Sequence, residues 1–311
     1  MTNLAIAADG LRKSYGDKVV LDGVDLAVPE GTVFALLGPN GAGKTTTVQI
    51  LSTLVPADGG TVSVAGHDLA RDPDGVRGAI GVTGQYSAVD KLLTGEENLR
   101  LMADLHHLPR REGRHRAAAL LDRFDLADAA RKPAGTYSGG MRRRLDLAMT
   151  LVGDPRVIFL DEPTTGLDPR SRRAMWRIVR ELVADGVTIF LTTQYLEEAD
   201  GLADRIALLD HGRLIAEGTA DELKRLIPGG HVRLTFADAG LLDAAHRIVG
   251  AGAPDPDTLT LRVPGDGVRA IRDLLVALDA HAIDVAALTV HTPDLDDVFL
   301  TLTAPQKESV R

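Results

Sequence analysis

The sequence predicts an α/β fold built on a parallel sheet and followed by a small C-terminal α+β domain. Continuously apolar runs, VFALLG (33–38), VIFLD (157–161) and VTIFLTT (187–193), alternate with segments of helical periodicity. Strands that are apolar throughout and alternate with helices are typical of a parallel sheet covered on both faces. After residue 230 shorter strands and helices replace this pattern, which predicts a second domain.

The first domain is expected to span residues 1–228. Thr94 and Glu97 have the spacing of a capping box, which marks the start of a helix. The expected strands are 4–9, 19–21, 24–28, 33–38, 61–66, 79–84, 157–161 and 187–193, with a hairpin over 205–218. Helices are expected from residue 44 to about 54, within 94–132, and from about 170 to 184.

The second domain is expected to span residues 231–311, after a linker at Pro228-Gly229-Gly230. Strands are predicted at 231–236, 258–263 and 283–290, helices near 239–249 and 267–280, and a last amphipathic segment at 293–303. This domain carries seven Lys and Arg against twelve Asp and Glu. A solvated acidic surface explains that excess better than a cation site.

Composition excludes several classes of function. The 311 residues include no cysteine, which excludes disulfides and zinc–thiolate sites and fits a reducing cytosol. The net charge of −9 argues against a dedicated nucleic-acid-binding protein. No apolar stretch approaches the roughly 18 residues of a membrane span, and the N-terminus does not read as a signal peptide. Any membrane role is therefore expected to come through a partner.

The segment GPNGAGKT (38–45) has the G-x-x-x-x-G-K-[ST] pattern, after a strand and before a helix. Its backbone N–H groups can surround phosphates, Lys44 can reach the β- and γ-phosphates, and Thr45 can bind Mg²⁺. The sequence therefore predicts a nucleoside triphosphate site. The candidate residues are Gly38, Pro39, Asn40, Gly41, Ala42, Gly43, Lys44, Thr45 and Thr46.

Two acidic residues end the apolar run at 157–161. Asp161 is placed to hold Mg²⁺, and Glu162 to act as the base for, or to orient, an attacking water. A solvated acidic turn is the alternative for the pair alone, but the phosphate loop disfavours it.

Three further segments, GVTGQ (81–85), YSGGM (137–141) and LTTQYLEEAD (191–200), complete a set that resembles the nucleotide-binding subunit of an ABC transporter. The daunorubicin-resistance type of ATP-binding subunit is more similar still, through YSGGMRRRLDLA (137–148) and LDDVFLTLT (295–303). This resemblance implies a P-loop NTPase cassette with an antiparallel β subdomain and a helical subdomain at about 86–155. Residues 231–311 would be an accessory or dimerisation domain.

The resemblance also implies two such subunits arranged head to tail, with each ATP between one phosphate loop and the partner's Ser138, Gly139 and Gly140. Asp168 resembles an acid that crosses between subunits. Gln85 resembles a residue that touches Mg²⁺ and moves with the membrane partner. Tyr15 resembles the aromatic that stacks on adenine, and an ordinary strand-end tyrosine is its alternative.

The sequence departs from the broader family at two positions. Met141 replaces a glutamine and cannot make its side-chain hydrogen bonds. Gln194 stands where histidine is usual; alone it reads as a surface loop residue, but the resemblance implies a catalytic contact from its amide to the γ-phosphate. The run Arg142, Arg143, Arg144 either helps to hold phosphates or, as we favour, forms a solvated, partner-facing side of its helix.

These observations predict an ATPase motor subunit of an exporter for a hydrophobic drug or natural product. It is expected at the cytoplasmic face of the cell membrane, as a homodimer joined through ATP and the C-terminal domain, on a separate integral membrane permease. One alternative is a soluble ABC ATPase acting on ribosomes or DNA, which the single cassette and the acidic charge disfavour. An ATP-switched drug-binding regulator is the other, and residues 231–311 leave it open.

Overall fold

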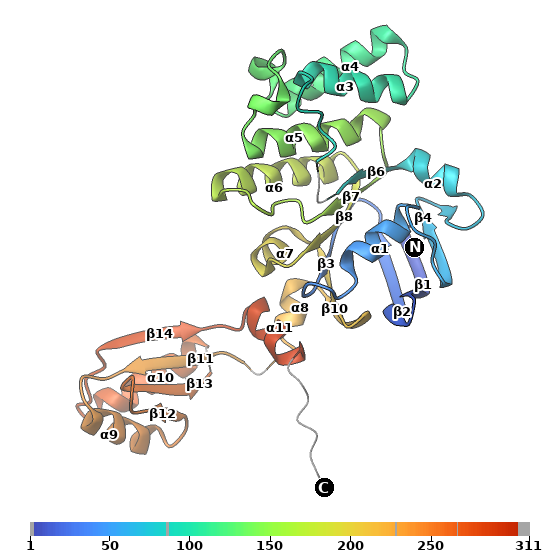
Figure 1. Ribbon diagram of the computed structural model, residues 1–311. Helices are drawn as coiled ribbons and strands as arrows, with labels where there is room; N and C mark the ends of the chain where they lie inside the picture. Colours follow the sequence, from blue (N-terminus) through green and yellow to red (C-terminus); the bar gives the residue numbers. More distant parts are fainter. Residues whose placement is uncertain (1–2, 85–86, 228, 266, 304–311) are drawn as a thin grey trace. The chain divides into compact units, whose positions relative to one another are not determined.

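The computed structural model describes residues 3–84, 87–227, 229–265 and 267–303 (Figure 1). The chain forms two compact units, Met1–Ala220 and Asp221–Arg311, each with its own sheets. The division therefore falls slightly before the expected linker, whose first residue, Pro228, lies outside the described residues.

A six-stranded sheet forms the centre of the first unit. Its order is β10-β9-β3-β8-β7-β6, and all neighbours are parallel except the β9–β10 hairpin. The strands are β3 (Val33–Leu37), β6 (Ile80–Thr83), β7 (Val157–Asp161), β8 (Thr188–Thr193), β9 (Arg205–Asp210) and β10 (Arg213–Gly218). Every residue of β3, β7 and β8 is buried, which is why these runs are apolar throughout.

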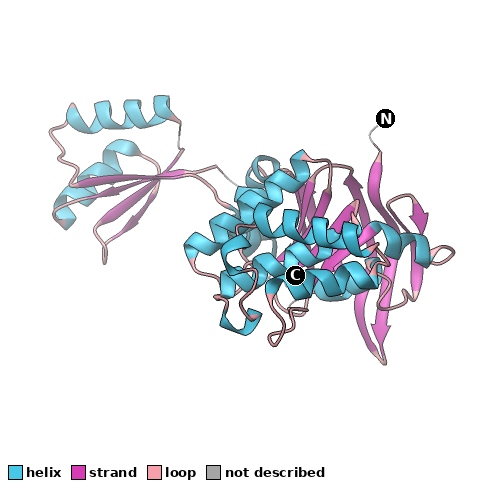
Figure 2. Cartoon of the chain, turned by 90° about the horizontal axis from the view of Figure 1, so that it is seen from above, coloured by secondary structure: helices cyan, strands magenta, loops and turns pink. Residues whose placement is uncertain are grey.

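One face of this sheet shares a core with helix α1 (Lys44–Leu51) and with a second, antiparallel sheet. Phe34 and Phe190 stack in that core with their ring centroids 5.5 Å apart. Three more helices belong to this part of the unit, α2 (Pro73–Ala79), α6 (Pro169–Ala184) and α7 (Leu196–Leu202), and Figure 2 shows helices lying against the strands.

The antiparallel sheet has the order β2-β1-β4-β5, with β1 (Leu4–Tyr15), β2 (Lys18–Pro29), β4 (Gly59–Val64) and β5 (His67–Asp68). β1 and β2 are each longer than the sequence indicated. Register shifts, for example between Ala8 and Leu11, let each strand continue past a point where the alternation of buried and exposed side chains is interrupted.

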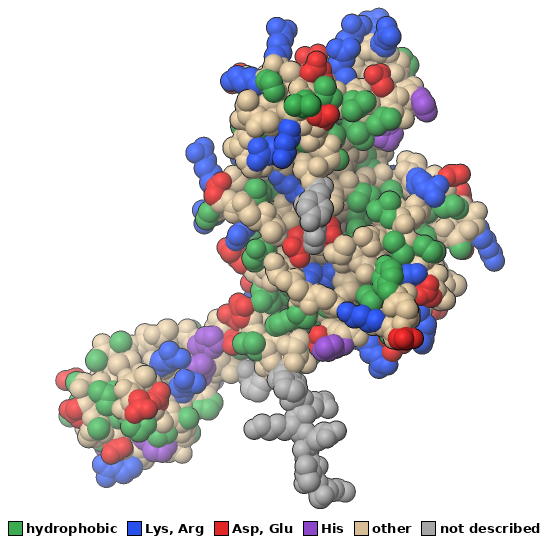
Figure 3. Space-filling model, viewed as in Figure 1, with side chains coloured by type: hydrophobic (Ala, Val, Ile, Leu, Met, Phe, Trp, Pro, Cys, Tyr) green, Lys and Arg blue, Asp and Glu red, His purple; other side chains and the backbone are tan. Residues whose placement is uncertain are grey.

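The helical region consists of α3 (Gly95–Leu105), α4 (Arg110–Arg123) and α5 (Gly139–Thr150), with 3-10 turns at Ala127–Ala129, Ala134–Thr136 and Leu151–Gly153. The capping box predicted at Thr94 and Glu97 is confirmed, since both reciprocal hydrogen bonds are present. Figure 3 shows Lys and Arg side chains gathered over this region, where Arg110, Arg111 and Arg114 of α4 are exposed. Basic charge is thus concentrated here in an otherwise acidic chain.

The second unit contains a four-stranded antiparallel sheet of order β12-β13-β11-β14. Its elements are α8 (Ala220–Lys224), β11 (His231–Thr235), α9 (Ala239–Val249), β12 (Ala253–Asp255), β13 (Thr260–Pro264), α10 (Val268–Asp279), β14 (Ala287–His291) and α11 (Leu295–Thr303). This is a split β-α-β arrangement. Val232 and Leu234 of the sheet share a core with Leu242 of α9 and Leu278 of α10.

The short edge strand β12 was not expected, because three residues give too little alternation to recognise. Among the described residues, no helix combines the length and the apolar character that crossing a bilayer requires.

Candidate nucleotide-binding site

The phosphate-loop sequence lies between β3 and α1, as predicted (Figure 1). Two of its glycines have no room for a side chain. A Cβ on Gly38 would lie 2.2 Å from the carbonyl oxygen of Leu209, and one on Gly43, whose φ is 114°, would lie 2.7 Å from Leu21 Cδ2. Only glycine therefore allows the loop to pack this closely against β9 and β2.

Lys44 begins α1 and is 5% exposed. Its ammonium donates to the carbonyl oxygens of Gly38 at 2.7 Å and Pro39 at 3.1 Å, so it lies across the loop. Burial lowers the pKa of Lys44, against the charges of Glu162 and Asp161, which raise it. The buried ammonium of Lys44, with two acids nearby, is suited to bind a negatively charged phosphate group.

Asp161 ends β7 and is buried, with 3% of its surface exposed. Its Oδ1 accepts hydrogen bonds from the hydroxyls of Thr45, at 3.4 Å, and of Thr192. The register of the sheet causes this meeting, because Asp161 pairs with Thr192 and Thr193 with Leu37, the residue just before the loop.

Thr45 and Asp161 suit Mg²⁺, which prefers oxygen ligands and takes one or two carboxylates together with substrate phosphates and water. In the described part of the chain, no group of three or more His, Cys, Asp or Glu side chains could hold a metal ion. That donor set fits a metal whose remaining ligands come from the substrate and from water.

Glu162 has a left-handed backbone, with φ of 49°. Its N–H donates to the carbonyl oxygen of Thr192 at 3.1 Å and approaches the Thr192 hydroxyl at 3.2 Å, and its Oε2 accepts from Thr165 at 3.3 Å. A residue with a Cβ adopts this conformation only where its surroundings hold it there.

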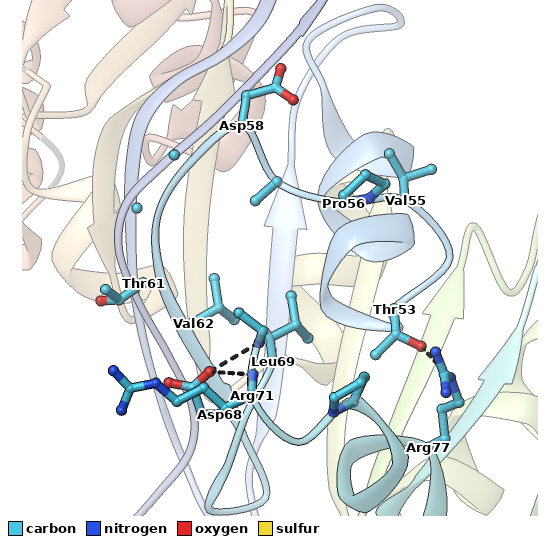
Figure 4. Close-up of a pocket in the computed structure, with 15 residues that line it drawn as sticks. Thr53, Val55, Pro56, Asp58, Thr61, Val62, Asp68, Leu69, Arg71 and Arg77 are labelled. Atoms are coloured by element: carbon cyan, nitrogen blue, oxygen red, sulfur yellow. Dashed lines mark hydrogen bonds between the residues drawn. The ribbon is translucent and has the colours of Figure 1, made fainter.

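Glu162 borders two hollows. One, of about 320 Å³, contains the phosphate loop; the other, of about 450 Å³, contains Gly139 at the start of α5. The first is lined by Lys18, Val20, Asn40, Gly41, Gly43, Lys44, Thr45, Thr46 and Glu162. A larger hollow of about 590 Å³ lies beside β4 and α2, and Figure 4 shows Thr53, Asp68 and Arg77 among its lining residues. None of the predicted site residues lines that larger hollow.

Ser138 and Asp168 cap helices. Ser138 Oγ accepts from the N–H of Met141 at 3.2 Å at the start of α5. Asp168 accepts from the N–H of Ser171 at 2.9 Å and from its hydroxyl at 2.7 Å at the start of α6, and the hydroxyl bond is the main cause that lowers the pKa of Asp168. A Cβ on Gly140 would lie 2.6 Å from Ser171 Oγ, whereas one on Gly139 would meet nothing within 4 Å.

Neither Tyr15 nor Gln194 lines the phosphate-loop hollow. Tyr15, at the end of β1, is 48% exposed, and the ammonium of Lys13 lies 5.4 Å from its ring centre. Gln194 is partly exposed and directly follows Thr193, the last residue of β8, which pairs with Leu37 of β3. Gln85 lies outside the described residues.

The arginine run of α5 does not form the solvated surface that we favoured. Arg142 donates to the carbonyl of Tyr137, Arg144 to that of Phe124, and the side chain of Arg143 is only 11% exposed. Arg143 donates instead to backbone carbonyls around Asp161. Sequence reasoning missed the contacts of Arg143 and Thr192 because their partners are distant in sequence. A local signal existed for Arg143 alone, since Arg143 and Asp146 stand at i, i+3 on one helix, a spacing that favours an ion pair.

The fold and the site define a class of protein. A phosphate loop between a strand and a helix, with two acids at the end of a parallel strand of the same sheet, here β7, separated from β3 by β8, is the arrangement of a P-loop nucleoside triphosphatase.

The comparisons with known proteins specify the family. Residues 21–165 match the family described as ABC transporter. The chain is 51% identical over 315 residues to "Daunorubicin resistance ATP-binding protein DrrA2" of Streptomyces coeruleorubidus, covering 99% of this chain and 98% of that protein. It is 47% identical over 319 residues to "Doxorubicin resistance ATP-binding protein DrrA" of Mycobacterium tuberculosis (strain ATCC 25618 / H37Rv), covering 99% and 96%.

Solved structures agree over about 72% of the chain. The structure of an ATP-binding subunit of an ABC transporter is similar with a TM-score of 0.64 and 31% identity, over 72% of this chain and 93% of that chain. A nucleotide-free ATP-binding cassette has a TM-score of 0.66 and 26% identity, over 72% and 94%.

The chain belongs to the ABC transporter family, as an ATP-binding subunit similar over nearly its whole length to daunorubicin-resistance proteins. It is an ATPase whose hydrolysis of ATP is coupled to transport, and such subunits work with a membrane permease component. The predicted family, fold class and ATPase activity are confirmed.

Proposed function

We propose that this chain supplies the energy for export of a hydrophobic drug or natural product. The support is similarity across nearly the full length of relatives whose names state daunorubicin or doxorubicin resistance, at 47–51% identity. Relatives named for other cargoes are less similar, such as "Nod factor export ATP-binding protein I" of Ralstonia nicotianae at 37%.

The observation that carries the proposed chemistry is that Lys44, Thr45 and Glu162 line one hollow, beside Asp161. The loop N–H groups and Lys44 bind the ATP phosphates, and Thr45 and Asp161 hold Mg²⁺. Mg²⁺ held by Thr45 and Asp161 would supply positive charge to the phosphate oxygens, where negative charge develops. Glu162 accepts a proton from the attacking water while the oxygen of that water bonds to the γ-phosphorus. The bond between the γ-phosphorus and the oxygen that bridges it to the β-phosphate breaks, which gives ADP and phosphate.

The site is completed by a second copy of the chain. Ser138, Gly139 and Gly140 of the partner approach the γ-phosphate, and the open surroundings of Gly139 leave the start of α5 free for this contact. Gln194 donates from its amide to the γ-phosphate, Tyr15 stacks on adenine, and Gln85 contacts Mg²⁺. Asp168 lies near the junction of the subunits, where it orders the start of α6.

Beyond the cassette, residues 231–311 stabilise the homodimer, and the assembly lies at the cytoplasmic face of the membrane on an integral permease. ATP binding closes the two copies and hydrolysis reopens them, a conformational step that limits the rate of many such enzymes. The movement passes to the permease through the segment after Gln85 and through α3 and α4.

The test is to co-express the chain with a candidate integral membrane permease and to purify the complex from membranes. We expect co-purification, ATP hydrolysis stimulated by daunorubicin, and drug efflux that is lost with Glu162→Gln. Hydrolysis by a chain that never associates with membranes would support the soluble ATPase instead. Tight drug binding without efflux would support the regulator.

A further inference from the structure

Arg143 contacts both catalytic acids through their backbone and not through their carboxylates. Its guanidinium donates to the carbonyl oxygens of Pro163 at 2.9 Å, Asp161 at 3.2 Å and Glu162 at 3.4 Å. It also donates to Gly84 O, at the end of β6, at 2.9 Å. One side chain of α5 therefore holds three consecutive carbonyl groups, those of the last residue of β7 and of the two residues after it.

Asp146 extends this arrangement one turn further along α5. It is 3% exposed, and its Oδ2 lies 3.3 Å from Arg143 while its Oδ1 accepts from the N–H of Ala88 at 3.0 Å. Arg143 and Asp146 thus hold Gly84 and Ala88, which stand on either side of residues 85–86. A buried ion pair stabilises a fold only when its remaining hydrogen-bonding groups are also satisfied, as they are here.

The backbone conformation of Glu162 explains what the contacts of Arg143 and Asp146 can do. Its φ of 49° places it in a region that residues with a Cβ rarely adopt, so contacts on both sides must hold it. Thr192 holds the N–H of Glu162, and Arg143 holds its carbonyl oxygen and those of its two neighbours.

We propose that Arg143 is a positioning residue for Glu162, and that with Asp146 it links the direction of the Glu162 side chain to Gly84, to Ala88 and to α5. This inference rests on the proposed role of Glu162 as the base. A shift at either linked element would then move the carboxylate relative to the attacking water. Small displacements of a catalytic group are costly to the chemical step and not to substrate binding.

The test compares Arg143→Lys with Arg144→Ala in the complex of the full chain with its permease. Lysine keeps the charge but has one nitrogen, so it cannot reach the same set of carbonyls. We expect kcat for ATP to fall by about tenfold to a hundredfold while KM stays within about twofold. Arg144→Ala is the control on the same helix, because among the described residues Arg144 bonds to Phe124 and Asp125 at the end of α4; its kcat should stay near wild type even if its Tm falls.

A purely structural role predicts a different result, in which both variants lose thermal stability and kcat falls in proportion, with KM also changed. A kcat of Arg143→Lys within twofold of wild type would overturn the proposal. Glu162→Gln tests separately the assumption that Glu162 is the base. If the single variant Glu162→Gln keeps wild-type hydrolysis, the base is misassigned. If it is inactive and adding Arg143→Lys lowers its residual rate further, Arg143 acts by another route than through Glu162.

Discussion

The hydroxyl of Thr192 joins the two acids of the site, because it donates to Oδ1 of Asp161 and lies 3.2 Å from the N–H of Glu162. Thr192 pairs with Asp161 across β7 and β8, so the sheet itself fixes the relation between these groups. The direction of both acids is thus set by the neighbouring strand.

Thr192→Val should therefore weaken the site without unfolding the protein. Valine keeps the shape but, among the residues that the structure describes, leaves Oδ1 of Asp161 with only the 3.4 Å contact to Thr45. We expect a higher Mg²⁺ requirement for ATP hydrolysis and a stability loss of about 1 kcal/mol. Thr188→Val, on the same strand, removes a hydroxyl that accepts from Gly31 at 2.9 Å. It should show the stability loss alone, and an equal change in Mg²⁺ dependence would contradict the assignment.

Glu162→Gln should stop hydrolysis while leaving ATP binding intact. The amide cannot accept the proton of water at neutral pH, and loss of a general base costs about 10²–10⁴-fold in rate. ATP should then hold the two copies together, which size-exclusion chromatography with and without ATP can measure. Glu181→Gln, an exposed change on α6, is the control for loss of one charge. Normal turnover by the Glu162 variant would remove this residue from the mechanism.

Gly139→Ala tests whether a partner subunit completes the site. A Cβ here meets nothing within 4 Å in the single chain, so folding and ATP binding should be unchanged. In the proposed dimer the methyl group would press on the partner's ATP, and hydrolysis should fall by about tenfold or more. Gly38→Ala gives the opposite pattern, with loss of stability in the chain itself, because its Cβ would lie 2.2 Å from Leu209 O. Unchanged hydrolysis with Gly139→Ala would argue against the head-to-tail arrangement.

Gln194→Ala should slow hydrolysis if the amide contacts the γ-phosphate, whereas an unchanged rate would show that the assigned contact is wrong. Gln194→His should be faster than the natural protein, and it should add a pH dependence near neutrality, since histidine titrates there and glutamine does not. Steady-state rates between pH 6 and 8 in all three proteins are the measurement.

The sequence predicted the site best where its residues are contiguous. The loop at 38–46 and the pair Asp161 and Glu162 each stand directly after an apolar run, so periodicity places them at the carboxyl ends of strands. Thr192 and Arg143 could not be assigned in this way, because their partners lie distant in sequence and their contacts follow from strand register and helix docking. The antiparallel sheet was predicted only by resemblance, since register shifts hide the full length of β1 and β2.

Glu198, in α7, offers a test of the buried region behind the site. It is fully buried and accepts from the indole N–H of Trp176 at 3.2 Å, with Arg172 nearby. Burial raises the pKa of Glu198 above its ordinary value of 4.5, despite hydrogen bonds and the charge of Arg172, which lower it. Between the ordinary and the raised pKa the folded state binds more protons than the unfolded state, so this group makes stability fall as pH rises.

Glu198→Gln removes that dependence, because the amide stays neutral. Relative to the natural protein, the variant should gain stability as pH rises above 4.5, and the gain should level off once the pH exceeds the raised pKa. Each unit of pKa shift corresponds to about 1.4 kcal/mol. Urea unfolding from pH 4 to 8 measures the difference, with Glu197→Gln as the control for losing a negative charge beside Arg172, since the Glu197 side chain is 74% exposed. A difference that shrinks as pH rises would show that the folded protein instead stabilises the ionised carboxylate.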